Sequence, residues 1–184
     1  MKTANKIFLL LISLVACIGL DQATKVLATA TLKGHAPQSF LANTLRLEYA
    51  ENPGAFLGMG GGLPDWERWA LLTVASSVVL GLLLAFVCLR KDLRMADVAG
   101  YALILAGGVS NMIDRIIAGV VVDFLNMGVG NLRTGIFNVA DMAIMAGLFV
   151  VVGSHLVQRK VGAAAPAGDA ETKPEAKGSG DAVA

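Results

Sequence analysis

Four apolar segments, each long enough to cross a lipid bilayer, constrain the fold of this chain more than any other feature. A helix rises about 1.5 Å per residue, so crossing the hydrocarbon core takes about 20 predominantly apolar residues. The predicted spans cover residues 7–28, 69–89, 96–118 and 136–157. With 55% hydrophobic and 16% charged residues, the chain is too apolar for an ordinary soluble domain of 184 residues. We therefore expect an all-α membrane protein with four transmembrane helices.

The first apolar segment also fits a cleaved targeting sequence. Lys2 and Lys6 precede the apolar run of residues 7–20, as in a secretory signal peptide. The sequence LVAC at residues 14–17 resembles the lipobox at which a bacterial lipoprotein is lipidated and cut. The apolar run continues for three residues past Cys17, where a mature lipoprotein usually turns polar. Retention as the first transmembrane helix is therefore favoured.

Basic residues predict which side of the membrane each end occupies. Lysine and arginine in short loops near helix ends stay on the cytoplasmic side. One side of a four-pass chain carries Lys2, Lys6, Arg90, Lys91, Arg94, Arg159 and Lys160. The other side carries Lys33, Arg46, Arg68 and Arg133, spread over longer segments. We therefore expect both termini, and the loop of residues 90–94, in the cytoplasm.

The first outer segment, about residues 29–68, predicts a small extracytoplasmic β-sheet. Leucine 41, 45 and 47 with Tyr49 form a partly alternating pattern that suits strands, and a glycine-rich run at residues 58–62 ends it. Trp66 and Trp69 then lie where aromatic rings favour the membrane interface. Residues 1–158 are thus expected to form one membrane domain.

The segment after this domain, residues 159–184, is predicted to be a disordered cytoplasmic tail. It is rich in Ala, Gly, Pro and mixed charge. Such a composition lacks the apolar side chains needed to offset the entropy of ordering.

Ionisable groups inside a membrane span indicate a structural or functional role, because inserting one at mid-helix costs about 2.5 to 3.5 kcal/mol. Asp21 and Lys25 lie four residues apart on one helical face, which favours an intrahelical pair that orients the first span or binds a neighbour. Asn111 shares a face with Asp114 and with Arg115 near the same outer end. A structural role, in which Asn111 and Asp114 hydrogen-bond other helices while Arg115 reaches the membrane interface, is as consistent with the pattern as binding of substrate.

Asp123 and Asp141 carry the strongest indication of chemistry. Asp123 is flanked by apolar residues on both sides, just past the third span. Asp141 lies about five residues into the fourth predicted span, roughly 8 Å along its axis, with Asn138 one turn before it. Two carboxylates in a site of low dielectric tend to share one proton, which leaves one base and one acid. That division is what an aspartic protease needs.

Other chemistries are less well supported. Ser110 has no suitably placed base, and His35 and His155 are far from the acids along the helix axes. Cys17 and Cys88 lie in apolar stretches without the spacing of a metal site, and a net charge of +1 argues against nucleic acid as a partner. Ion-coupled transport stays open, because carboxylate and amide oxygens suit hard cations.

Five short motifs, taken in order, resemble one family. They are DQATK at residues 21–25, ENPGAF at 51–56, GGVSNMIDR at 107–115, VVDF at 121–124 and FNVAD at 137–141. Together they resemble lipoprotein signal peptidase, also called signal peptidase II, a bacterial inner-membrane aspartyl protease. The motifs extend over nearly the whole membrane core and leave out the tail.

The resemblance implies that Asp123 and Asp141 are the catalytic dyad. It also implies that the following residues bind substrate or support the dyad: Asn52, Gly54, Asn111, Asp114, Arg115, Asn138, Asp21 and Lys25. The implied substrate is a prolipoprotein whose lipobox cysteine already carries diacylglycerol, cleaved just before that cysteine without metal or other cofactor. The implied site lies near the periplasmic face, with membrane lipid around it and the cyclic peptide antibiotic globomycin as an inhibitor.

Small residues on two predicted spans would let those helices approach closely enough to bring the acids together. They are Ala106, Gly107, Gly108 and Ser110 on the third span and Ala143 and Gly147 on the fourth.

Overall fold

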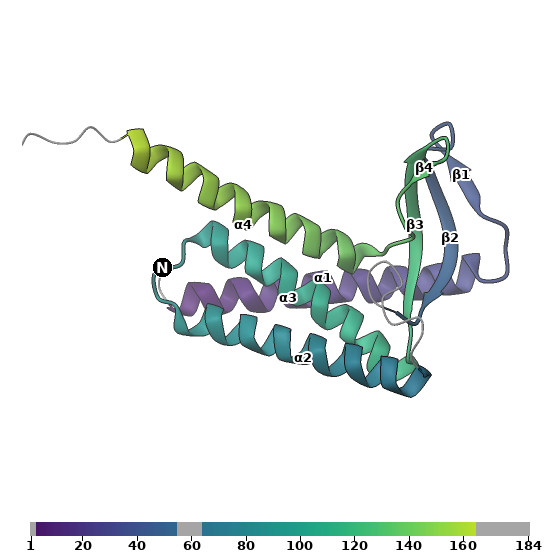
Figure 1. Ribbon diagram of the computed structural model, residues 1–184, viewed down its shortest axis with the longest axis horizontal. Helices are drawn as coiled ribbons and strands as arrows, with labels where there is room; N and C mark the ends of the chain where they lie inside the picture. Colours follow the sequence, from purple (N-terminus) through teal and green to yellow (C-terminus); the bar gives the residue numbers. More distant parts are fainter. Residues whose placement is uncertain (1–2, 55–63, 165–184) are drawn as a thin grey trace, which may run out of the picture.

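All four predicted spans are helices. The computed structural model of the protein describes residues 3–54 and 64–164, so the predicted glycine-rich break at residues 58–62 lies outside the described residues. The helices are α1 (Thr3–Leu32), α2 (Asp65–Leu89), α3 (Met95–Ala118) and α4 (Val139–Ala164) (Figure 1). Each is long and apolar enough to cross a membrane. Helix α1 runs through Cys17 without a break, as expected for a transmembrane helix.

Helix α4 runs past the predicted start of the tail. It continues to Ala164, so residues 159–164 are helical although the sequence predicts disorder there. Once a helix is formed, each further residue adds a backbone hydrogen bond, and the sequence RKVGAA contains no proline; its one glycine, Gly162, disfavours the helix without ending it. Pro166 follows shortly afterwards and disfavours helix in the residue before it. The rest of the predicted tail, residues 165–184, lies outside the described residues.

Helix α3 is the centre of the bundle and packs against the other three helices. Half of its most apolar stretch is buried, whereas only 6% of the corresponding stretch of α2 is. Large apolar side chains on the outer helices, such as Phe8, Val79 and Phe149, are exposed in the absence of lipid. A bilayer is the solvent that such a surface requires.

The small residues of α3 pack against two different helices, α4 and α2. Gly107 lies against the first turn of α4, and Gly100 and Gly147 lie against each other's helix, as the close approach of α3 and α4 requires. Gly108 instead faces the side chain of Leu80 on α2. Its predicted place in the α3–α4 contact is therefore wrong, because a helix turns by about 100° per residue and Gly108 points to a different neighbour.

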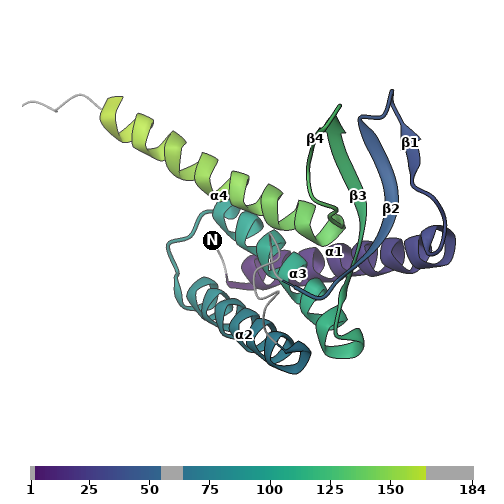
Figure 2. The same ribbon diagram turned by 45° about the vertical axis from the view of Figure 1, so that its right-hand side comes forward.

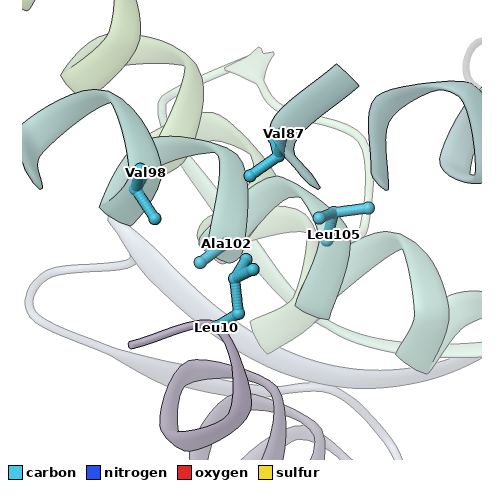
Figure 3. Packing of buried hydrophobic residues seen from close by; sticks show 5 residues of the cluster. All are labelled: Leu10, Val87, Val98, Ala102 and Leu105. Atoms are coloured by element: carbon cyan, nitrogen blue, oxygen red, sulfur yellow. The ribbon is translucent and has the colours of Figure 1, made fainter. Parts of the chain in front are cut away.

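A compact apolar cluster holds the bundle together at the end opposite the sheet. It consists of Leu10 of α1, Val87 of α2, and Val98, Ala102 and Leu105 of α3 (Figure 3). Beside it, the buried ammonium of Lys6 donates hydrogen bonds to the carbonyls of Cys88 (3.3 Å) and Arg90 (2.8 Å). A cation at these carbonyls satisfies acceptors that a helix C-terminus leaves without intrahelical partners.

The predicted small sheet is present, although half of it comes from an unpredicted part of the chain. The strands are β1 (Gln38–Phe40), β2 (Leu45–Asn52), β3 (Val121–Val129) and β4 (Leu132–Arg133), antiparallel in the order β1-β2-β3-β4. Figures 1 and 2 show the sheet standing across one end of the helices, with the N-terminus of α1 at the other end.

The predicted strand position of Leu41 is wrong. Leu41, Ala42 and Asn43 all have positive φ angles and form the turn between β1 and β2. The backbone N–H and the hydroxyl of Thr44 both donate to the Leu41 carbonyl, at 3.1 and 2.8 Å, and so close the turn. An alternating count of leucines cannot detect such a turn, because it registers side chains and not the backbone.

Two connections fix the sheet to the helices. Gly119 ends α3 in the left-handed conformation (φ 76°), which lets the chain turn directly into β3. After β4, Phe137 exchanges backbone hydrogen bonds of 2.8 Å with Leu125 of β3 just before α4 begins. The chain just before α4 is thereby held against β3. Asp123 on β3 and Asp141 in the first turn of α4 lie near this junction.

Candidate active site

Asp123 and Asp141 meet on the side chain and backbone of one residue, Asn138. The Asn138 amide nitrogen Nδ2 donates to Asp123 Oδ1 at 2.7 Å. Its oxygen Oδ1 accepts from the backbone N–H of Asp141 at 2.9 Å, and its own backbone N–H donates to Asp141 Oδ2 at 3.2 Å. The two acids, 18 residues apart in the sequence (123 and 141), are therefore joined through a single buried amide.

Asp141 lies in the first turn of α4 and not in the second, as the predicted span implied. The helix begins at Val139, so Asn138 is its N-cap and Asp141 its third residue. The reciprocal hydrogen bonds between the two are those of a capping box, in which each side chain satisfies the other residue's backbone N–H. The N-terminal turn of a helix also interacts favourably with negative charge.

Asp123 comes from β3 and is held by two amide donors. Asn52 of β2 donates from Nδ2 to Asp123 Oδ2 at 3.0 Å, across the antiparallel pair, while Asn138 donates to the other oxygen. The residue is only 3% exposed. Burial raises the pKa of Asp123 to about 6, opposed by the hydrogen bond from Asn52 and reinforced by the negative charge of Asp141. Near neutral pH this carboxyl can therefore bind or release a proton.

Arg115 links the Asn52 segment to α3. Its guanidinium donates to the carbonyls of Gly54 (3.4 Å) and Asn111 (3.3 Å), and its own carbonyl accepts from the indole of Trp69. The Gly54 N–H in turn donates to Asn52 Oδ1 at 3.0 Å, which directs the Asn52 amide nitrogen at Asp123. The buried Nε of Arg115 has no partner among the described residues, so this cation keeps an unused donor near the acids.

Lys25 forms the centre of a second polar layer behind the dyad. Its ammonium contacts Asp21 Oδ2 at 2.7 Å, Asp114 Oδ2 at 2.6 Å and Asn111 Oδ1 at 2.8 Å. The predicted intrahelical pair with Asp21 is thus present, and it also binds a neighbouring helix. Asp21 Oδ1 accepts from the backbone N–H of Ala140 at 2.7 Å, so α1 caps the first turn of α4.

Two residues of this layer were not predicted to belong to the site. Gln22 donates to Asp114 Oδ1 at 2.8 Å and to Ser110 Oγ at 3.1 Å, and Ser110 donates to Asp21 Oδ2 at 2.7 Å. Ser110 shares a helical face with Asp114, four residues on, so its spacing was a usable signal. Gln22 lies next to Asp21, and its spacing gives no such signal.

The remaining candidates lie away from the dyad. The ring of His155 contacts the Val151 carbonyl one turn earlier in α4, and His35 is exposed beyond the end of α1. Within residues 3–54 and 64–164, no group of three or more His, Cys, Asp or Glu side chains is placed to hold a metal ion. What the site offers is two carboxyl groups that share a bridging amide, one with a pKa near neutrality and one at a helix N-terminus.

Comparison with known proteins identifies relatives of this chain. The family model described as signal peptidase (SPase) II matches residues 13–157. The lipoprotein signal peptidase of Desulforapulum autotrophicum is 37% identical over 162 residues, which cover 88% of this chain and 98% of that protein. The lipoprotein signal peptidase of Sphingopyxis alaskensis is 37% identical over 160 residues, covering 84% and 86%.

Solved structures share the fold. A bacterial membrane enzyme determined by the in meso method at 2.3 Å resolution superposes with a TM-score of 0.73 at 22% identity, covering 91% of this chain and 94% of that one. A second, at 1.9 Å resolution, gives a TM-score of 0.69 at 24% identity, with 80% and 92% covered. The family model and both relatives cover most of the chain, so the chain belongs to the signal peptidase II family.

Proposed function

We propose that this chain is an aspartyl endopeptidase that removes the signal peptide from diacylglyceryl-modified prolipoproteins, cutting before the lipidated cysteine. The observation that carries the proposal is the bridging of Asp123 and Asp141 by Asn138 at the end of the helices where the sheet begins. Family membership supports the substrate class. The catalytic type is inferred from the two carboxyl groups.

The reaction consumes one water and one peptide bond. The ionised carboxylate takes a proton from water while the water oxygen attacks the carbonyl carbon, and the protonated carboxyl hydrogen-bonds the carbonyl oxygen. The tetrahedral intermediate then collapses: the C–N bond breaks, and the amine nitrogen receives the proton that the carboxylate took from water, which returns the pair to its singly ionised state. The products are the signal peptide with a free carboxylate and a lipoprotein with a free amino group on its cysteine. In our assignment Asp141 is the base, since a helix N-terminus favours its ionised form, and Asp123 holds the proton.

The supporting residues divide into two groups in this proposal. Asn52, Gly54 and Arg115 form the side of the site nearest the sheet, and the unused guanidinium donor suits a substrate carbonyl. Asn111 and Asn138 orient the carboxylates through amide N–H groups. Behind them, Asp21, Lys25 and Asp114 fix α1 and α3 against the entry of α4.

The proposed setting is the bacterial inner membrane, with both termini cytoplasmic and the dyad near the periplasmic face. Basic residues support this orientation, because Lys6, Arg90 and Arg94 lie at the end opposite the sheet. A lipidated cysteine keeps its acyl chains in the bilayer, so a dyad at the hydrocarbon boundary meets the adjacent peptide bond with little further movement. We extend the proposal to inhibition by globomycin, which the family resemblance implies. The division into a membrane domain of residues 1–158 and a tail stays a prediction.

Cleavage by purified protein tests the proposal. The chain is incubated in detergent with a prolipoprotein carrying diacylglyceryl cysteine, with a chelator present, and products are read by mass. We expect one cut immediately before the cysteine, no cut in the unlipidated prolipoprotein, and inhibition by globomycin. Asp123→Asn and Asp141→Asn should each abolish cleavage while keeping the thermal unfolding transition.

Asp92→Asn is the matched control. Asp92 lies in the loop after α2 and pairs with Arg90 at 2.6 Å, at the far end from the dyad. It carries the same chemical change without touching the site, so its cleavage rate should equal that of the wild type. Retained cleavage in a folded Asp123→Asn or Asp141→Asn variant would remove that residue from the dyad.

A further inference from the structure

Lys25 is enclosed by oxygen atoms: its ammonium donates a hydrogen bond to Asn111 and forms ion pairs with Asp21 and Asp114. An ammonium carries three N–H groups and no acceptor. Its three contacts, to Asp21, Asp114 and Asn111, all lie between 2.6 and 2.8 Å. The side chain is 4% exposed, so water does not substitute for these partners. Whatever Lys25 touches must therefore present an oxygen to it.

That requirement fixes how the Asn111 amide is turned. Its oxygen faces Lys25 and also accepts from Asn138 Nδ2 at 3.1 Å. Its nitrogen Nδ2 is then left to donate to Asp141 Oδ1 at 2.9 Å. The reverse orientation would set two donors against each other at Lys25 and an oxygen against the carboxylate of Asp141. Only one orientation is compatible with an ionised Asp141.

The same orientation continues to the second acid. Asn138 donates one Nδ2 hydrogen to Asn111 and the other to Asp123 Oδ1, while its oxygen accepts from the Asp141 backbone. In this buried chain of hydrogen bonds, Lys25 and Asn138 both donate to the Asn111 oxygen. The Asn111 nitrogen then donates to Asp141, and the Asn138 nitrogen donates to Asp123. Hydrogen bonds from ionised donors are the strongest in such a chain and polarise those that follow.

We propose that Lys25 is a positioning residue for the dyad: acting through the Asn111 amide, it keeps an N–H donor on Asp141 and so stabilises the singly ionised state of the pair. The proposal rests on the proposed function for its kinetic consequence, but the orientation of the amide can be tested without activity. In this proposal the Lys25 side chain, on α1, contacts neither acid. It nevertheless influences the pH range over which the dyad is active.

The charged groups around this chain are few and known. Lys25 faces Asp21 on its own helix and Asp114 on α3, while Asn138, from the entry of α4, donates to the same Asn111 oxygen as Lys25. The dyad itself faces Arg115 from α3. A test at position 25 must therefore hold the charge of the Asp21–Lys25–Asp114 cluster constant.

Paired double variants meet that condition. In Lys25→Met with Asp114→Asn, the cluster keeps a net charge of −1 from Asp21, as in the wild type, but position 25 has no donor. In Lys25→Gln with Asp114→Asn, the net charge and side-chain size are nearly the same and an amide donor remains. Asp114→Asn alone reports the effect of the background change.

The readout is the acidic limb of the pH profile of kcat/KM, which reports the free enzyme's essential ionised group. We expect the Met variant to move this limb to higher pH by about one unit, since a hydrogen bond to a charged group changes the balance between protonation states by about tenfold. The Gln variant should shift clearly less, and Asp114→Asn alone should not shift upward. The proposal would be overturned if the Met variant had a lower Tm but the acidic limbs of all four proteins, wild type and variants, lay at the same pH. Lys25 would then have only a structural role.

A measurement on the wild type keeps the proposal testable if the Met variant does not fold or cleave. With ¹⁵N-labelled asparagine, the Nδ2 signal of Asn111, assigned by its loss in Asn111→Ser, should titrate with the dyad and move in Asp141→Asn. If the signal neither titrates with the dyad nor moves in Asp141→Asn, the Asn111 N–H does not face Asp141. If wild-type protein cleaves nothing, the proposed function fails while this titration still decides the orientation of the amide.

Discussion

The contact between Gly107 and the first turn of α4 offers a sensitive test of the site's geometry. A Cβ atom added at Gly107 would meet the backbone carbonyl oxygen of Ala140 and lie 2.8 Å from Ile144 Cγ1. The Ile144 side chain can rotate, but the carbonyl of Ala140 is part of the helix that carries Asp141. Gly107→Ala therefore cannot be accommodated without moving α4 away from α3.

The size of that movement follows from the distances. Ordinary van der Waals contact begins at 3.4 Å, so relieving the contact with Ile144 alone takes 0.6 Å, and the carbonyl contact is closer still. Overpacking costs about 1–3 kcal/mol, while Gly→Ala within a helix gains about 1 kcal/mol, so the net loss of stability is modest. Catalytic groups need to be held within about 0.5 Å, so the loss of activity is larger, on the order of 10- to 100-fold in kcat.

The assay compares initial cleavage rates and Tm for Gly107→Ala and Gly81→Ala. Gly81 lies in α2 and has no atom within 4 Å of the added Cβ, so it carries the same chemical change in open space. We expect Gly81→Ala to cleave at the wild-type rate with a Tm at least as high. A folded Gly107→Ala variant within twofold of the wild-type kcat would refute the claim that the α3–α4 distance sets the dyad geometry.

Two further predictions concern stability. Because burial raises the pKa of Asp123 to about 6 from about 4 in the unfolded chain, wild-type stability should fall as pH rises between these values. The Tm of Asp123→Asn, measured relative to that of the wild type, should therefore rise between about pH 4 and pH 6 and stay constant outside this range. Lys6→Met removes the hydrogen bonds to the carbonyls of Cys88 and Arg90, so chemical unfolding in detergent should show a loss of about 1–3 kcal/mol. Since Lys6 lies at the opposite end from the dyad, kcat/KM should not change; a large loss of kcat/KM in folded protein would contradict this separation.

The sequence was most informative where one physical requirement dominates. Length and apolarity alone define a bilayer-spanning helix, so all four spans were predicted, with errors of a few residues at their ends. An acid flanked by apolar residues has few explanations, which is why Asp123 and Asp141 could be selected before the fold was known. The Asn-x-x-Asp spacing of residues 138–141 is also a capping signature, and it would have placed Asp141 in the first turn of its helix.

The sequence was least informative where pairing over long distances decides the structure. In the sequence, strand β3 is an apolar run at the end of a span, and it becomes a strand because β2, about 70 residues or more earlier, pairs with it. Gln22 and Ser110 likewise acquire their roles only when α1 packs on α3. Such contacts depend on which helices are neighbours, and side-chain periodicity within one helix does not carry that information.

The network behind the dyad has two tasks at once, because lipid provides no hydrophobic force to hold apolar helices together. Helices in a bilayer associate through close packing and polar contacts, and here the polar contacts join α1, α3 and α4 through Lys25, Asn111 and Asp21. These groups also determine which way the amides next to the acids are turned. A substitution in this layer therefore changes fold and chemistry together. Only charge-balanced pairs, in which the packing is kept and a single donor is removed, can separate the two.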